Sequence, residues 1–202
     1  MPKPSVLVLA AHPDLRLSRV NRALIHAAAD LPHVHVRDLY ALYPDYVIDV
    51  PAEQALAASA DLIVWLHPVH WYSMPPLMKL WLDEVLTLGW AYGPGAQALR
   101  GKDLWLVTST GGPDVAYSPQ GYNRYFFDAF LPPYEQTAAL CGMRFLPPLV
   151  LHGAHQVPDA DVAAHQATWV QRLQQYPDWP EMANLADCPL CAVPGDDRPQ
   201  EA

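Results

Sequence analysis

Five short apolar runs, separated by stretches with helical spacing, constrain the fold of this 202-residue chain more than any other feature. The runs are nearly continuous in Val, Leu, Ile, Ala and Trp, which is typical of strands buried on both faces. Parallel strands are joined by right-handed crossovers that place helices over the sheet. The pattern therefore predicts an α/β domain with a doubly wound parallel sheet.

The expected boundaries follow from these runs and from turn residues. Strands are expected at residues 6–11, 34–38, 61–67, 103–108 and 145–151, and helices at residues 18–31, 52–60, 76–88, 134–141 and 159–176. Ser18 is placed to cap the first helix. From Pro177 the chain is rich in proline and acidic residues, so we expect one domain over residues 1–176 and a mobile or loosely docked tail over residues 177–202.

Composition narrows the classes of function. A net charge of −9 argues against nucleic-acid binding, which depends on Lys and Arg contacts to phosphates. No apolar run approaches the ~18 residues that cross a bilayer, and residues 1–5 lead into a strand rather than a signal sequence, so we expect a cytoplasmic protein. In the tail, Cys188 and Cys191 have the spacing of half a zinc site or a redox pair, with two exposed thiols as the simpler interpretation.

Three loops follow the first, third and fourth expected strands, whose carboxyl ends meet at the sheet edge where ligands bind. Residues 12–21 combine a hydroxyl, an amide, two arginines and a helix N-terminus, which together suit a phosphate. Residues 67–76 carry an aromatic pair. Residues 110–121 contain paired glycines whose backbone can approach a flat ring, and Tyr117 beyond them can reach a substrate.

Taken in order, these motifs resemble the flavodoxin-like NAD(P)H:quinone oxidoreductases, and most closely the ancillary oxidoreductases of bacterial glutathione-regulated potassium-efflux systems. The resemblance covers residues 4–176 and rests on Ala11-His-Pro with Ser18 and Asn21, His67-Pro-x-x-Trp-Tyr-Ser-x-Pro-Pro, Gly89-Trp-Ala-Tyr-Gly and Thr110-Gly-Gly. It implies a flavodoxin-like sheet of order 2-1-3-4-5, a homodimer and bound FMN, with FAD as the alternative. It also implies ping-pong, two-electron reduction of quinones or related electrophiles by NAD(P)H.

The resemblance also implies roles for individual residues. Flavin contacts carry over onto His12, Ser18, Arg19, Val20, Asn21, Val69, His70, Trp71, Tyr72, Thr110, Gly111, Gly112 and Pro113. Tyr117 matches the family's substrate-side tyrosine. Some relatives place a histidine six positions later, where this chain has Asn123, and asparagine holds no proton at neutral pH. We therefore expect Tyr117 or backbone N–H groups to act without that histidine, and keep Tyr117 and Asn123 as the candidate catalytic positions.

The expected homodimer has separate support from the chain itself. The helix at residues 76–88, with Trp81 and the segment 90–92, offers more large apolar side chains than one covered sheet face requires. A two-fold dimer would bury the excess and wall the flavin site.

Two other functions remain open. The chain can serve as a regulatory flavin-binding subunit of a membrane potassium-efflux protein, held at the inner face of the cell membrane by that partner. Residues 11–14, Ala-His-Pro-Asp, also resemble the first motif of the zinc-dependent N-acetyl sugar deacetylases. In that interpretation the His67/His70 and His152/His155 pairs would be further imidazole ligands. Strand-end histidines have simpler explanations, so we expect no metal.

Overall fold

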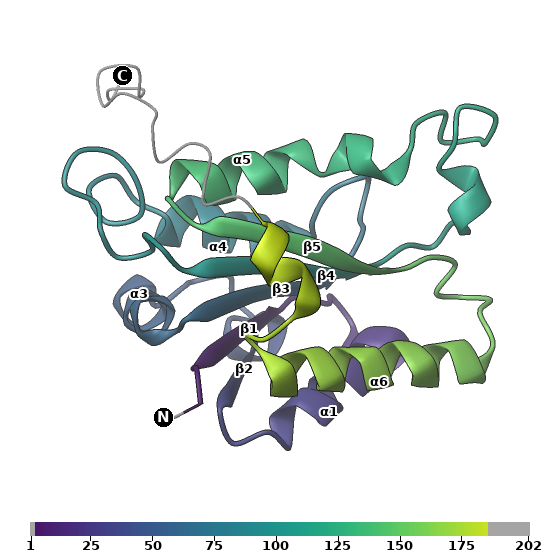
Figure 1. Ribbon diagram of the computed structural model, residues 1–202, viewed down its shortest axis with the longest axis horizontal. Coiled ribbons are helices and arrows are strands. Elements are labelled where there is room, and N and C mark those ends of the chain that lie inside the picture. The colour runs from purple at the N-terminus through teal and green to yellow at the C-terminus, as the bar shows by residue number, and fades with distance from the viewer. Residues whose placement is uncertain (1–2, 186–202) are drawn as a thin grey trace.

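The computed structural model describes residues 3–185 and contains a five-stranded parallel sheet, shown edge-on between its helices in Figure 1. The strand order is β2-β1-β3-β4-β5, which confirms the predicted order. The strands are β1 (Val6–Ala10), β2 (Val34–Asp38), β3 (Leu62–Pro68), β4 (Asp103–Ser109) and β5 (Arg144–Leu151). Each lies within one residue of its expected position because continuous apolar runs end where polar loops begin.

Helices cover both faces of the sheet. The α-helices are α1 (Val20–Ala29), α2 (Leu39–Leu42), α3 (Val50–Ser59), α4 (Pro76–Val85), α5 (Pro132–Leu140) and α6 (Asp159–Gln175). Short 3₁₀ turns are η1 (Leu15–Leu17), η2 (Asp114–Ala116), η3 (Phe127–Phe130) and η4 (Pro180–Asn184). The α2 turn was not expected. It forms because Asp38 accepts a hydrogen bond from the Ala41 backbone N–H at 3.3 Å.

Two hydrophobic cores lie on opposite faces of the sheet, and the strands supply both. Leu7 and Leu9 of β1 pack in the core under α3, α4 and α5, whereas Val6 and Val8 pack in the core under α1 and α6. Adjacent residues of a strand point to opposite faces, so a strand covered on both sides must be apolar throughout. This is the physical reason for the continuous runs in the sequence.

Helix α4 ends three residues earlier than the spacing predicts. The Gln54 amide of α3 donates to the Val85 carbonyl at 3.0 Å and to the Thr87 hydroxyl at 3.1 Å. The Val85 carbonyl also accepts from the Thr87 backbone N–H at 3.0 Å, so the Gln54 side chain and a local turn together satisfy the helix end. The chain then turns, and the Ala91 N–H donates to the Thr87 carbonyl at 2.9 Å.

Trp81 of α4 belongs to the interior, so it does not supply the dimer surface that its apolar character suggested. Its side chain is 1% exposed, and its indole N–H donates to Glu53 Oε2 at 2.9 Å. Glu53 is fully buried and also accepts from Arg37 and from the Tyr43 hydroxyl, so the buried carboxylate is paired and hydrogen-bonded. The expected dimer therefore rests on other residues and stays a prediction.

Residues 177–185 pack against the domain. Trp179 is 4% exposed, its ring lies 4.7 Å from that of Trp105, and its indole N–H donates to the Arg172 carbonyl at 2.8 Å. Arg172 also pairs with Glu181 at 2.6 Å. Residues that follow α6 thus dock on the domain, and the expected division of the chain at residue 176 stays a prediction. Cys188 and Cys191 lie outside the described residues.

Candidate functional site

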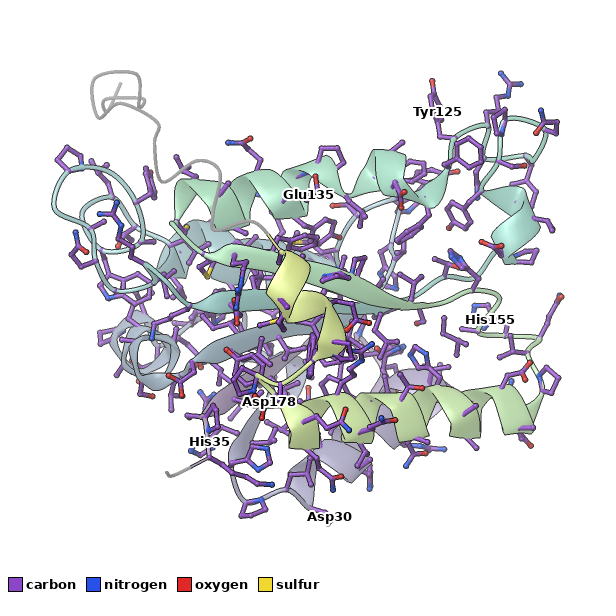
Figure 2. The ribbon with its side chains drawn as sticks, in the orientation of Figure 1. Asp30, His35, Tyr125, Glu135, His155 and Asp178 are labelled. Carbon is purple, nitrogen blue, oxygen red and sulfur yellow. The ribbon has the colours of Figure 1, made fainter. Side chains whose placement is uncertain are left out.

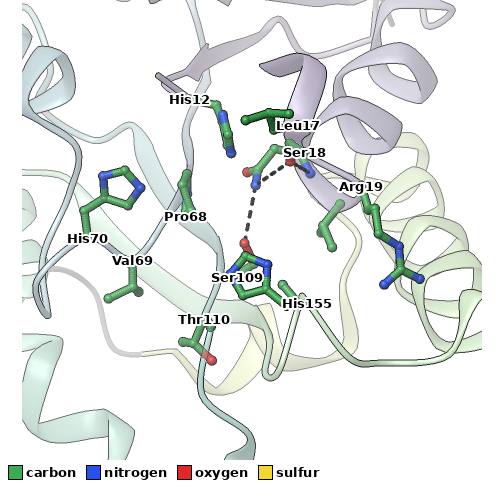
Figure 3. Close-up of a pocket in the computed structure, with 14 residues that line it drawn as sticks. His12, Leu17, Ser18, Arg19, Pro68, Val69, His70, Ser109, Thr110 and His155 are labelled. Carbon is green, nitrogen blue, oxygen red and sulfur yellow. Dashed lines mark hydrogen bonds between the residues drawn. The ribbon is translucent and has the colours of Figure 1, made fainter. Parts of the chain in front are cut away.

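A pocket opens at the carboxyl edge of the sheet, where four loops meet (Figure 3). The loops follow β1, β3, β4 and β5, and the pocket encloses about 200 Å³. It is lined by His12, Leu17, Ser18, Arg19, Val20, Asn21, Pro68, Val69, His70, Ser109, Thr110, Gly111, Ala154 and His155. Nine of the thirteen residues expected to contact a flavin are in this set. Trp71, Tyr72, Gly112 and Pro113 are not.

The start of α1 forms a polar wall of the pocket. Ser18 Oγ accepts from the Asn21 backbone N–H at 3.0 Å, which is the expected capping bond. The Asn21 amide donates to Ser18 Oγ and to Ser109 Oγ, both at 3.3 Å, and so ties α1 to the end of β4 (Figure 3). Among residues 3–185, no group pairs with the buried Asn21 Oδ1. The wall therefore presents free hydrogen-bonding capacity together with the positive end of a helix dipole.

Two histidines line the pocket on the loops after β1 and β3. His12 Nδ1 accepts from the Asp14 backbone N–H at 3.2 Å, so the neutral ring carries its proton on Nε2. Burial lowers the pKa of His12, and the nearby His70 lowers it further. Burial also lowers the pKa of His70. Both rings are therefore neutral at pH 7 and present hydrogen-bonding groups without charge.

The turn at Trp71 and Tyr72 has an unusual backbone. His70 and Ser73 exchange backbone hydrogen bonds of 3.0 Å, and the two residues between them have φ values of +48° and +64°. Such turns favour Asn-Gly because bulky residues are strained at positive φ. The turn leaves Trp71 93% exposed beside the pocket. The strained turn thus places an exposed indole next to the pocket residue His70.

Gly121 and Gly111 differ in whether the protein's own packing requires a glycine. A Cβ on Gly121 would lie 2.3 Å from the Ala116 carbonyl oxygen, so the tight turn between them requires glycine. A Cβ on Gly111 would make only ordinary contact, 3.5 Å from His155. The protein's own packing therefore does not require glycine at position 111, where the bare backbone borders the pocket.

Tyr117 lies behind the pocket rather than on its lining. Its ring packs against Phe127, Phe130 and His152 with centroids 5.4, 6.0 and 5.2 Å away, and it is 7% exposed. Burial raises the pKa of Tyr117, and a hydrogen bond with Thr110, which does line the pocket, opposes this effect. Tyr117 is thus a protonated phenol that is separated from the pocket by one side chain, that of Thr110.

Asn123 takes part in holding the loop above Tyr117. Its Oδ1 accepts from the Tyr72 hydroxyl at 3.3 Å, and its backbone N–H donates to the Ala116 carbonyl at 3.1 Å. Tyr72 in turn stacks on Phe130 at 5.3 Å. Tyr72 and Asn123 therefore connect the strained turn to the loop that carries Tyr117.

The sequence reasoning missed five pocket residues, which are Leu17, Pro68, Ser109, Ala154 and His155. Ser109 extends β4 by one residue, and His155 lies in the loop between β5 and α6 (Figure 2). The signal for His155 was available, because β5 is parallel and its carboxyl end must open at the same edge.

The histidine pairs do not assemble into a metal site. His67 is fully buried and His155 is exposed. Over residues 3–185, no three His, Cys, Asp or Glu side chains are grouped to hold a metal ion. The geometry gives the zinc deacetylase alternative no support.

In the part of the chain that the structure describes, none of the helices has both the length and the apolar character of a membrane span.

Comparisons with known proteins agree with this architecture. A family model described as flavodoxin-like fold matches residues 4–173. The glutathione-regulated potassium-efflux system ancillary protein KefF of Klebsiella aerogenes is 44% identical over 180 residues, which cover 87% of this chain and 97% of that protein. Among solved structures, general stress protein 14 of Treponema denticola in complex with FMN is 36% identical with a TM-score of 0.79, covering 85% and 98% of the two chains. An NADPH-quinone reductase from P. pentosaceus is 31% identical with a TM-score of 0.72, covering 85% and 96%. The chain therefore belongs to the family with the flavodoxin-like fold.

Proposed function

We propose that this protein is an FMN-dependent oxidoreductase that transfers two electrons from NAD(P)H to quinones or related electrophiles. The observation that carries the proposal is the convergence of a helix N-terminus, neutral histidines and a bare glycine backbone on one pocket. The proposal is supported by a relative solved with FMN and by one named NADPH-quinone reductase.

The residues present suit FMN. The N-terminus of α1 and Ser18 would hold its phosphate, since the first N–H groups of a helix have no partner within it. The unpaired Asn21 Oδ1 would accept from a ribityl hydroxyl. A cavity of about 200 Å³ is smaller than most small-molecule pockets, which measure ~300–1,000 Å³. Val69 and Gly111 would therefore hold only part of the flat ring within the pocket.

When bound, the flavin supplies hydride transfer, and the chain's residues position the reactants and move protons. The exposed aromatic side chains of Trp71 and Tyr72 offer flat surfaces to an aromatic substrate. Tyr117, kept protonated by burial, would donate a hydrogen bond to the oxygen on which negative charge develops. A second copy of the chain covering this open side would exclude water, which is the role we propose for a homodimer.

The direct test is to purify the protein and identify any released flavin by absorption and mass. Added FMN at ~1,000 times its dissociation constant should stabilise the native state by ~4 kcal/mol and raise the melting temperature accordingly. Tyr117→Phe should keep the flavin content and reduce quinone turnover by ~10-fold, which corresponds to ~1.4 kcal/mol. A folded protein that binds neither FMN nor FAD would refute the proposal.

A second proposed role follows from the 44% identity to the potassium-efflux ancillary protein across 97% of its length. The chain would then also bind a membrane potassium-efflux protein and lie at the inner face of the membrane through it. Potassium efflux from cells that contain the transporter, with and without this chain, tests the role. The Tyr117→Phe variant separates regulation from catalysis, because a regulatory subunit should still activate efflux after turnover falls.

A further inference from the structure

The sequence offered His152 only as one of a pair of possible metal ligands with His155, whereas the structure places it directly after β5, beside Tyr117. Its ring lies 5.2 Å from Tyr117 and 5.2 Å from Phe127, and its side chain is 18% exposed. Its Nδ1 lies 3.0 Å from Thr110 Oγ1, and its Nε2 lies 3.5 Å from Asp114 Oδ1. The imidazole therefore stands between a pocket residue and an exposed carboxylate.

The hydrogen bonds of Thr110 determine which nitrogen carries a proton. A carbonyl oxygen only accepts, so Thr110 donates its hydroxyl proton to the Gly112 carbonyl at 2.7 Å. Thr110 Oγ1 must then accept from His152 Nδ1–H, and its other lone pair remains for the Tyr117 hydroxyl. In neutral His152, Nε2 would turn a lone pair toward the Asp114 carboxylate. A second proton there would convert this repulsion into an ion pair.

We propose that His152 is a positioning residue that acts through Thr110 and holds the proton with which Tyr117 is replenished. This inference rests on the proposed quinone reduction. It supplies, from another strand, the histidine that is missing at Asn123. The groups that face His152 are Thr110 from the end of β4, Asp114 from η2, Tyr117 after η2 and Phe127 from η3.

In this relay each group that gives up a proton receives one from the next, from His152 through Thr110 to Tyr117. Tyr117 gives its hydroxyl proton to the quinone oxygen as the substrate receives its hydride. The Thr110 hydroxyl turns from the Gly112 carbonyl to the Tyr117 oxygen and gives up its proton, and it takes the Nδ1 proton of the His152 imidazolium. His152 is left neutral, with its remaining proton on Nε2 toward Asp114. A flip of the ring then turns Nδ1 to the exposed side, where it regains a proton from water.

The relay has a pH signature. Burial lowers the pKa of His152 below 6.5, and Asp114 partly opposes this effect. The protonated form that the relay uses is therefore lost as pH rises through that lowered pKa, and turnover should fall with it. Asp114→Asn removes the opposing charge, so it should lower the pKa of His152 further and shift the decline in turnover to lower pH.

The first experiment needs no cofactor or substrate. The His152 imidazole is titrated by NMR in the isolated protein and in the Asp114→Asn and Thr110→Val variants. We expect a lower His152 pKa in the Asp114→Asn protein and a change in the Nδ1 signal in the Thr110→Val protein. His35 is exposed on β2 and lies at the other end of the molecule from His155 in Figure 2, so its signals serve as an internal reference. An unchanged His152 titration in both variants would overturn the inference.

The second experiment compares turnover across pH 5–8 in wild type, His152→Asn, His152→Ala and the control His35→Asn. Asparagine can still donate to Thr110 but does not titrate. The His152→Asn protein should therefore keep the flavin, lose the pH dependence of turnover and turn over ~10-fold more slowly, within the range of proton-transfer effects. The turnover of the His152→Ala protein should be lower still. A His152→Asn protein with the wild-type rate and pH profile would overturn the inference and leave the proposed function intact. Loss of flavin or of folding in both His152 variants would also overturn it, because the residue would then be structural. An inactive wild type would refute the proposed function instead, while the NMR titrations would still report on the geometry.

Discussion

The burial of His67 predicts that this protein loses stability in acid. The imidazole lies at the end of β3 with 0% exposure, and its Nδ1–H donates to the Pro68 carbonyl at 3.0 Å. Its ring stacks on Tyr134 with the centroids 5.8 Å apart. Within residues 3–185, its Nε2 has no hydrogen-bond partner. Burial therefore lowers the pKa of His67 from 6.5 to about 4.

The sign and size of the effect follow from proton linkage. Between pH 6.5 and about 4 the unfolded chain binds a proton at this position and the native state does not, so the free energy of unfolding falls as pH decreases through that window. The difference between the two pKa values corresponds to ~3 kcal/mol. His67→Phe retains an aromatic ring against Tyr134 and removes the titrating group. Its loss of stability between pH 7 and pH 4 should be ~3 kcal/mol smaller than that of the wild type.

Urea unfolding at several pH values between 7 and 4, followed by tryptophan fluorescence, measures this difference. His35→Asn, which removes an exposed histidine, is the control substitution. Parallel stability curves for wild type and His67→Phe would refute the reasoning, because they would mean that His67 protonates as readily in the native state as in the unfolded chain.

Three further predictions test the fold and the site. Trp179→Ala should cost ~3–5 kcal/mol, because it empties a buried aromatic site, and truncation after residue 176 should cost at least as much. Calorimetry showing native stability for both would mean that the domain ends at residue 176. Gly121→Ala should destabilise the protein and increase amide exchange in the Tyr117 loop, since its Cβ would meet a backbone oxygen at 2.3 Å. The control Gly95→Ala has open space around its Cβ but a positive φ, so it should show only the cost of placing alanine at that φ. Ser18→Ala should cost ~1 kcal/mol and weaken FMN binding in a titration; unchanged affinity would remove Ser18 from the phosphate site.

The strands could be predicted almost to the residue, whereas several roles of large side chains could not. Leu7 and Val8 are both buried, and a continuous apolar run is enough to predict this for a covered parallel sheet. Trp81 and Trp179 have the same chemistry in the sequence as surface aromatics. Each is buried because a distant partner, Glu53 or Trp105, accepts its N–H or packs on its ring. Local periodicity contains no information about such contacts.

In the candidate site, too, local signals predict some residues and distant contacts determine others. Positions 18 to 21 and 110 to 111 could be predicted because cap chemistry and paired glycines are local signals. The spacing of His152 and His155 suggested only a metal-binding pair, and they reach the site because β5 pairs with β4 in parallel and ends beside it. The contact between His152 and Thr110 spans 42 residues of sequence, so it required the register of two strands.

Topology also explains why the pocket lies between β1 and β3 rather than beside another strand. From β1 the chain continues through α1 to β2 on one side, and from β3 it continues through α4 to β4 on the other. The two helices consequently cover opposite faces, with α1 in one core and α4 in the other. The loops that leave β1 and β3 must therefore diverge, and the gap between them is lined by His12 and Ser18 from one loop and by Val69 and His70 from the other. Because the gap follows from strand order, loop substitutions should change what binds there without removing the pocket itself.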